Sequence, residues 1–240
     1  EGSDPRPAVA LHYSSHATAG LSVDGSANPG DQVTVNIEDR AYTYIVQAGD
    51  TLEAIRDGLV ALINQDPLVE AFPTAQWTRI RLQARIPGPA GNGIKFSTKT
   101  NEEAQAILSV FNTQLCCASE AGSLVTEDNP ALPGETIIVY ATGLGLVSPD
   151  EAAAEAITGV RYKGPCLNRP ISPVSSMAGS RTANVFHAGL KPGSVGLYEV
   201  HLNINSGQPT NPRTAVTISQ DVYASNIVTI PVFNPDPAAE

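Results

Sequence analysis

Alternating hydrophobic and polar residues near the start of the chain predict a β-hairpin. Val33, Val35 and Ile37 alternate with polar residues, and a turn at 38–40 leads into a second extended run over 41–46. A period of two places one face of each strand against a core. We therefore expect two antiparallel strands here.

A helical period follows this hairpin. Asp50 and Glu53, three residues apart, resemble a capping box at a helix N-terminus. Apolar residues then recur three and four positions apart, which predicts one amphipathic helix that ends near Asp66 and Pro67. The apolar residues of this helix are Leu52, Ile55, Leu59, Leu62 and Ile63. We expect them to face a sheet built from Val33, Val35, Ile37, Ile80 and Leu82.

Two more strands are predicted after the helix. Apolar residues from Ile80 to Ile86 alternate with Arg and Gln, and a further extended run at 94–98 follows the glycine-rich stretch 88–93. We interpret that stretch as a hairpin turn, because it joins two strands and does not open a helix as a phosphate-binding loop would. The result is a β-β-α-β-β domain over 21–115, with a further short segment at 106–110.

Short strands separated by turn residues fill the second half of the chain. Apart from a helical pattern at 151–156, the extended runs are 135–142, 171–176, 182–188, 196–204, 215–219 and 226–232. This spacing is typical of an antiparallel sandwich. The predicted fold is mainly β: a small α+β domain followed by an immunoglobulin-like β-sandwich over 134–235. Residues 116–133 are predicted to be a linker that runs into the sandwich as an extended strand.

The N-terminal segment, residues 1–20, is predicted to be extended. Pro5 and Pro7 exclude a helix, and the residues that follow can form a strand. We expect the strand over 7–15 to pair with another copy of the protein, with Val9, Leu11 and Tyr13 filling apolar slots on the acceptor.

The charge and composition narrow the range of partners. The chain has 24 acidic and 14 basic residues and a net charge of -10, which disfavours nucleic acid and anionic membranes as partners. No apolar run approaches the roughly 18 to 20 residues that a membrane span needs, so we expect no membrane insertion. The low charged fraction and the many Gly and Pro residues are typical of exported β-proteins, which predicts a secreted or cell-surface location.

Three cysteines, Cys116, Cys117 and Cys166, suggest one disulfide in an exported protein. Because neighbouring cysteines rarely pair with each other, we expect Cys166 to bridge to Cys116 or Cys117. The third thiol is expected to be a buried free cysteine.

Motifs for catalysis or metal binding do not emerge from the sequence. A G-x-S-x-G turn is absent, and His12, His16, His187 and His201 form no HExxH motif. We expect no enzyme activity, no metal and no cofactor. Calcium is the one weak alternative, because carboxylates cluster at Asp24, Asp31, Glu38 and Asp39 and again at Glu127 and Asp128, without an EF-hand loop.

An arginine-lined strand offers one possible ligand face. Arg79, Arg81 and Arg85 share one side of the predicted strand, beside Trp77. Guanidinium groups suit carboxylates and an indole stacks on sugar rings, so this face could bind an acidic sugar. The alternative is an edge strand that alternating charges protect from unwanted pairing.

Three motifs in the second half resemble a known family. NPALPGETIIVYATGLG (129–145), HAGLKPGSVGLYEVHLNI (187–204) and ASNIVTIPV (224–232) are similar to the Solibacter uncharacterised C-terminal domain family, an immunoglobulin-like module related to IPT/TIG domains of secreted bacterial proteins. The resemblance spans about 121–232 and implies a sandwich without known catalytic residues.

The first domain resembles a different module. Residues 30–55 are similar to a β-β-α-β-β module of secreted and phage-tail proteins. Residues 44–52 also look like the start of a LysM peptidoglycan-binding repeat, but 66–73 fits the second LysM helix poorly.

Two functional hypotheses follow. The first is a non-enzymatic subunit of an extracellular filament or surface assembly, joined by strand addition of the N-terminal segment to other copies. The second is an adhesion module that binds carbohydrate or another surface protein through the arginine face or the sandwich loops.

Overall fold

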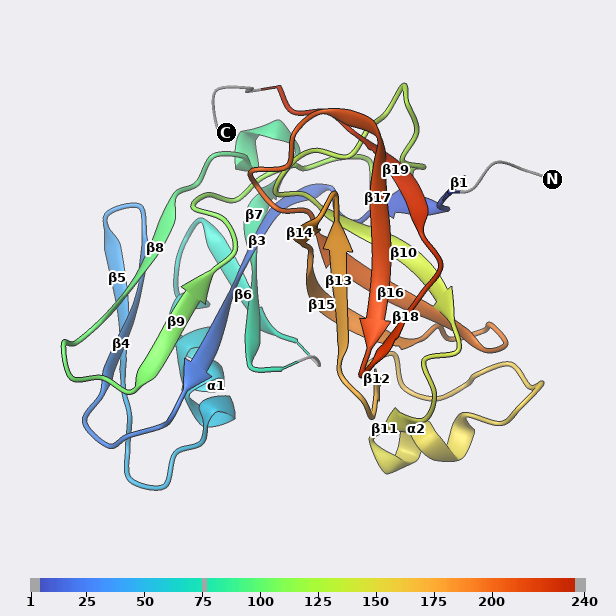
Figure 1. Cartoon of the computed structure of the whole chain (residues 1–240). Coiled ribbons are helices and arrows are strands. Elements are labelled where there is room, and N and C mark those ends of the chain that lie inside the picture. Colours follow the sequence, from blue (N-terminus) through green and yellow to red (C-terminus); the bar gives the residue numbers. More distant parts are fainter. Residues whose placement is uncertain (1–4, 75–76, 236–240) are drawn as a thin grey trace. The chain divides into compact units, whose positions relative to one another are not determined.

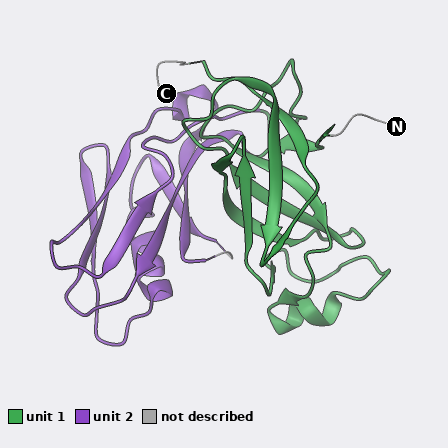
Figure 2. Ribbon diagram, viewed as in Figure 1, with its two compact units in different colours: residues 1–13, 120–240 green, residues 14–119 purple. Residues whose placement is uncertain are grey.

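The computed structural model describes residues 5–74 and 77–235, which form two compact units (Figures 1 and 2). Unit 1 contains residues 1–13 and 120–240, and unit 2 contains residues 14–119. The fold is mainly β, as the sequence predicted. The predicted domain order is wrong, however, because the α+β unit is inserted into the sandwich and does not precede it. The predicted boundaries after residues 20 and 115 move to 13/14 and 119/120.

Unit 2 contains two sheets and one main helix. The sheet orders are β6-β7-β3-β9 and β5-β4-β8. The elements are β3 (His16–Gly25), β4 (Gln32–Ile37), β5 (Arg40–Ile45), α1 (Leu52–Ile63), β6 (Val69–Pro73), β7 (Arg79–Pro87), the 3-10 helix η1 (Pro89–Gly91), β8 (Phe96–Thr100) and β9 (Ala106–Val110).

The predicted hairpin and helix of unit 2 are confirmed. Strands β4 and β5 pair antiparallel around a two-residue turn, and α1 starts after Thr51, whose hydroxyl accepts a hydrogen bond from the Ala54 N–H (3.3 Å). Leu59 is fully buried, and the predicted sheet residues belong to the same core. Periodicity therefore located the buried face of the helix correctly.

The predicted second hairpin is wrong. β7 pairs with β6 and β3, whereas β8 pairs with β4 in the other sheet. The glycine-rich stretch is therefore a connection between sheets. The hairpin partner of β7 is the short strand β6, which precedes it in the chain. Asp66 fixes the start of β6, because it accepts hydrogen bonds from the N–H groups of Leu68 (2.7 Å) and Val69 (3.0 Å).

Unit 1 is a two-sheet sandwich with short connecting elements. Its strands are β1 (Arg6–Pro7), β2 (Ala10–His12), β10 (Thr136–Thr142), β11 (Val147–Ser148), β12 (Arg169–Pro170), β13 (Val174–Ala178), β14 (Arg181–Thr182), β15 (Asn184–Leu190), β16 (Leu197–Asn203), β17 (Asn211–Gln220), β18 (Tyr223–Ala224) and β19 (Val228–Val232), with helix α2 at Asp150–Glu155.

The strand order of this sandwich matches an immunoglobulin constant-type domain. One sheet has the order β2-β10-β16-β15, and the other contains β13-β17-β19. If the seven strands are lettered A to G in the order of the chain, the two sheets have the strand orders A-B-E-D and C-F-G. Unit 2 is thus inserted between the first and second strands of an immunoglobulin-type sandwich.

The N-terminal segment pairs within its own chain, which corrects its predicted role. β2 pairs antiparallel with β10, and β1 pairs parallel with β19. The second edge of β2 meets the returning chain, since the His12 N–H donates to the Ser123 carbonyl (2.9 Å) and the Val125 N–H donates to the Ala10 carbonyl (2.9 Å). Residues 1–4 of the predicted segment lie outside the described residues.

The inward face of this segment is also the opposite of the predicted one. Val9 is 62% exposed, and Leu11 and Tyr13 are half-buried, whereas Ala10 and His12 are buried in the sandwich. The apolar residues Val9, Leu11 and Tyr13 therefore do not fill the interior slots assigned to them. A histidine can be buried at position 12, where an apolar residue would be expected, because the buried carboxylate of Glu135 pairs with it.

Candidate functional site

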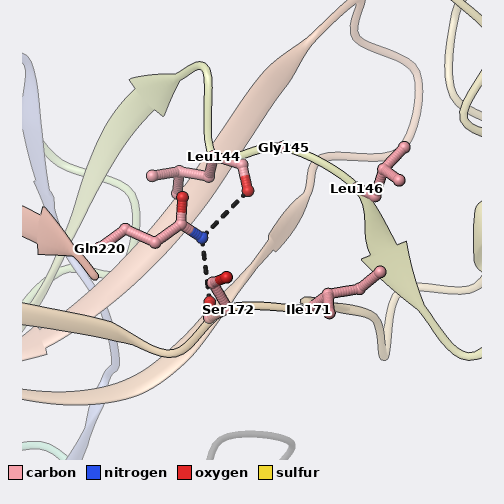
Figure 3. Close-up of a pocket in the computed structure, with 6 residues that line it drawn as sticks. All are labelled: Leu144, Gly145, Leu146, Ile171, Ser172 and Gln220. Carbon is pink, nitrogen blue, oxygen red and sulfur yellow. Dashed lines mark hydrogen bonds between the residues drawn. The ribbon is translucent and has the colours of Figure 1, made fainter. Parts of the chain in front are cut away.

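One end of the sandwich, here called the loop end, gathers several connections. The loop after β10 (143–146), the loop before β13 (171–173) and the end of β17 meet at Gln220. The Gln220 side-chain Nε2 donates to the Leu144 carbonyl (3.1 Å) and to the Ser172 carbonyl (2.9 Å), as Figure 3 shows. These residues line an open cleft of about 260 Å³, with Gly145, Leu146 and Ile171.

Glycines and a buried tyrosine shape the first of these loops. Gly143 and Gly145 have φ values of 83° and 78°, a region in which glycine meets no Cβ penalty. The buried Tyr198 hydroxyl donates to the Gly145 carbonyl. The backbone of this loop is therefore fixed by a buried side chain, while the Leu146 side chain is exposed to solvent.

A second pair of loops joins the same end. Tyr162, which is buried, donates its N–H to the Ser194 carbonyl (2.8 Å), and the Gly193 N–H donates to the Tyr162 carbonyl (2.8 Å). The Arg161 guanidinium adds a hydrogen bond to the Gly193 carbonyl (2.9 Å). The long connection 149–168 is thus attached to the β15–β16 loop.

Large apolar side chains point to solvent across these loops. Leu146 is 72% exposed and Val222, at the turn after β17, is 90% exposed. The exposed large apolar residues described on the loop end are Leu146, Ile157, Val160, Leu167, Ile171, Val195, Val222, Tyr223 and Ile227. Single exposed apolar residues are ordinary, but their concentration on the loops of one end makes this end the candidate interaction surface.

A polar network lies on the outer side of the β2-β10-β16-β15 sheet. Glu199 accepts hydrogen bonds from His201 Nε2 (2.9 Å) and Lys191 Nζ (3.0 Å), and Lys191 also donates to the Tyr140 hydroxyl (2.6 Å). The hydrogen bond from His201, followed by that from Lys191, lowers the pKa of Glu199 to about 2. Glu199 is therefore a fixed anion at neutral pH. His187 and His201 are half-buried at the surface, as predicted.

Sequence reasoning missed a buried ion pair in the sandwich. His12 Nδ1 and Glu135 Oε1 are 2.5 Å apart with side chains only 2% and 3% exposed. His12 Nε2 lies 3.2 Å from the Asn129 carbonyl, and Glu135 Oε2 accepts from the Leu132 N–H (2.9 Å). Burial lowers the pKa of His12, but the hydrogen bond and charge of Glu135 outweigh it, so the net shift is upward. The pair is sealed from solvent and anchors β2.

The predicted arginine face exists, but its own unit occupies it. Arg79 stacks on the Phe111 ring (5.3 Å to the centroid) and Arg81 on the Phe72 ring (4.6 Å). Arg85 pairs with Glu70 (2.6 Å). Burial lowers the pKa of Arg79 to about 10 and also lowers that of Arg81. Trp77 is half-exposed, and ligand binding here stays a prediction.

The alternative explanation of this face is wrong. β7 lies between β6 and β3 and is not an edge strand, so its charges do not guard an edge. They cover one side of an inner strand instead.

The predicted disulfide is also wrong. Cys116 and Cys117 are joined to each other, and Cys166 is an exposed free thiol in the other unit. Cys117 has a φ of 76°, and Asn92 Oδ1 holds this turn by accepting from the N–H groups of Cys117 (3.0 Å) and Ala118 (3.1 Å). Local backbone geometry thus overrides the general rarity of adjacent pairing.

Two of the carboxylates considered for calcium, Asp31 and Glu38, accept hydrogen bonds from separate backbone groups. Asp31 accepts from the N–H groups of Gln105 and Ala106 (both 2.9 Å), and Glu38 accepts from the Lys95 N–H (2.7 Å). In the described ranges, no three His, Cys, Asp or Glu side chains come together as metal ligands. None of the helices in these ranges is long and apolar enough to span a bilayer.

Comparisons with known proteins identify no family for this immunoglobulin-type sandwich. No family model and no curated protein matches the chain. One similar solved structure is the I9–I11 tandem from titin, with 8% sequence identity and a TM-score of 0.21, over 93% of this chain and 62% of the titin chain. The resemblance to the Solibacter family stays a prediction.

Proposed function

We propose that this chain is a non-enzymatic module that binds another protein through the loop end of its sandwich. The observation that carries this proposal is the concentration of exposed apolar side chains there, above all Val222, Leu146 and Ile171. Sandwich loops at one end are a common recognition surface, because a rigid scaffold positions them. A secreted or cell-surface location remains part of the proposal.

The chemistry of the loop end favours a protein partner over carbohydrate. Sugar rings need aromatic faces and convergent polar groups, whereas eight of the nine exposed large apolar residues described on the loop end are aliphatic, with Tyr223 the single aromatic among them. The cleft beside Leu146 and Ile171 can take an apolar anchor side chain, the kind of contact that dominates protein interfaces. Gln220 already uses both N–H groups of its Nε2 to hold the loops, so these donors are not available to a sugar.

The proposal can be tested with a photo-crosslinking amino acid at position 222. Proteins of the producing cell's surface or culture fluid that crosslink at this position are identified. Their affinity for the purified chain is then measured by calorimetry. We expect Leu146→Asp and Ile171→Asp each to weaken binding at least tenfold, because a charge would have to be desolvated in the cleft.

The matched control uses Ile107, an exposed apolar residue of unit 2. A crosslinker at position 107 should capture a different set, and Ile107→Asp should leave the affinity unchanged. A partner that binds Leu146→Asp and Ile171→Asp as tightly as the unmodified chain would refute the proposal.

A further inference from the structure

The outer strand of the three-stranded sheet in unit 2 has an open edge. β5 pairs with β4 on one side only. The Val46 N–H donates to the Asp31 carbonyl (2.9 Å), so even-numbered residues of this strand bond toward β4. Because the bonding direction alternates along a strand, the backbone groups of Ala41, Thr43 and Ile45 point away from the sheet.

These outward groups are almost entirely unused. Gln47 Nε2 donates to the Ile45 carbonyl (2.7 Å), but the other N–H and C=O groups of Ala41, Thr43 and Ile45 make no hydrogen bond within the described residues. All three residues are exposed. No Pro or Lys protects this stretch, although those residues commonly block edge pairing.

Two other strand edges, those of β6 and β15, are covered by side chains. At β6, Asn64 accepts from the Ala71 N–H (2.8 Å) and donates to the Ala71 carbonyl (3.1 Å), and the strand ends in Pro73. At β15, Asn168 does the same to Leu190 (2.7 and 3.0 Å). An asparagine clamp satisfies both backbone groups at an edge, so the open edge of β5 stands out against these two.

The sequence of β5 complements itself. In an antiparallel pair with a twofold axis at Thr43, Thr43 faces Thr43, and Ala41 faces Ile45 of the second copy. The outward backbone groups then form hydrogen-bonded pairs, and a small residue lies opposite a large one on the exposed face. Tyr42 and Tyr44 also face each other, which is a favourable aromatic pair.

Charge does not oppose this pairing within the strand. Arg40 is the one charged residue of β5, and its Nε donates to Asp66 Oδ2 (2.7 Å). We propose that the β5 edge is a self-association site, where the β5 strands of two copies pair antiparallel and join two three-stranded sheets into one of six. Such an isologous contact closes at two copies. It goes beyond the loop-end function and uses a different unit.

Cysteine crosslinking tests the register. In a Cys166→Ser background, Thr43→Cys should give a covalent dimer under mild oxidation, because facing residues of an antiparallel pair lie about 5.5 Å apart at Cα, within disulfide range. Ser97→Cys, exposed on β8 of the same sheet, is the matched control and should stay monomeric. Mass spectrometry locates the bond.

A proline variant tests the edge itself. The Thr43 N–H points outward, so Thr43→Pro removes an edge donor without removing a backbone hydrogen bond to β4, although the exposed hydroxyl contact between Thr43 and Thr34 (2.9 Å) is lost. In sedimentation experiments we expect the unmodified chain to dimerise, more strongly at higher salt because the net charge is -10, and Thr43→Pro to weaken dimerisation at least tenfold. Far-UV circular dichroism and Trp77 fluorescence check that the variant is folded. A monomeric unmodified chain, a dimer that survives Thr43→Pro, or a dimer whose Thr43→Cys variant does not crosslink at residue 43 overturns the proposal.

Discussion

The two units differ in how far apart along the chain the residues lie that pack together in their cores. In unit 2, the helix follows the β4–β5 hairpin directly, and the core residues of the whole unit fall between Ala17 and Leu115. In unit 1, the first strand is separated from the second by the whole of unit 2, and His12 pairs with Glu135 across 123 positions. Local periodicity can therefore describe unit 2 much better than the start of unit 1.

This difference also shows what holds a short strand in place. β2 has three residues, too few to be stable from burial of apolar surface alone. It is bonded to β10 on one edge and to residues 122–125 on the other, and its His12 is anchored by Glu135. The strand thus depends on polar contacts that alternation in the sequence does not reveal.

The largest expected effect comes from breaking the His12–Glu135 pair. We expect His12→Ala to destabilise unit 1 by about 3–5 kcal/mol, because it leaves a buried carboxylate without its partner. Urea unfolding followed by far-UV circular dichroism measures this loss. The half-buried His201→Ala is the control and should lose much less.

The pH dependence of the stability lost in His12→Ala provides a second test of the buried pair. The folded-state pKa of His12 is raised, so its stabilisation is fully present below about pH 6.5 and is lost as pH rises through the folded value. The difference between His12→Ala and the unmodified chain should therefore shrink above neutral pH. An equal difference at pH 6 and pH 9 would contradict a charged pair.

Leu59→Ala should act on the other unit. Removing this fully buried side chain should cost about 2–5 kcal/mol. Trp77, the single tryptophan, lies in unit 2, so its fluorescence reports the transition of that unit. Leu62→Ala, at a half-buried position of the same helix, should cost less. Equal losses for the two variants would show that the helical face is assigned incorrectly.

The smallest effect is expected for Glu199→Gln on the sheet face of unit 1. The pKa of Glu199 is lowered from 4.5 to about 2, so its stabilisation is present above about pH 4.5 and is lost as pH falls toward 2. The variant should be less stable than the unmodified chain at pH 6, and the two should converge near pH 2. The exposed Glu151→Gln serves as control, and a gap that persists at pH 2 would argue against the network.

Much of the fold could be predicted because periodicity is a local signal. The β4–β5 hairpin, α1 and the main sandwich strands followed from spacing alone. The partner of β7 could not, because β6 carries no clear alternation and sheet pairing is not local. The N-terminal strand was assigned the wrong face, since a two-residue period allows two faces and the apolar Val9 and Leu11 outweighed a histidine whose carboxylate partner was distant.

The loop end was harder to predict than the fold. Its apolar residues lie singly in glycine-containing loops, where no period marks them as a group. The sequence did carry one signal of the loop end. Apolar residues such as Leu146 stand in turns, where polar residues are more usual. Their convergence depends on the sandwich topology and on Gln220, neither of which spacing reveals.

The central structural claim is that, in every copy of the protein, the strand β2 pairs with β10 of the same chain and not with β10 of a neighbouring copy. Leu11 and Ile138 face each other between β2 and β10, so cysteines at both positions in a Cys166→Ser chain can form a disulfide. Electrophoresis without reductant should show one monomeric species with an internal bond. A ladder of covalent multimers would mean that the first strand is donated to a neighbour, and would contradict this account.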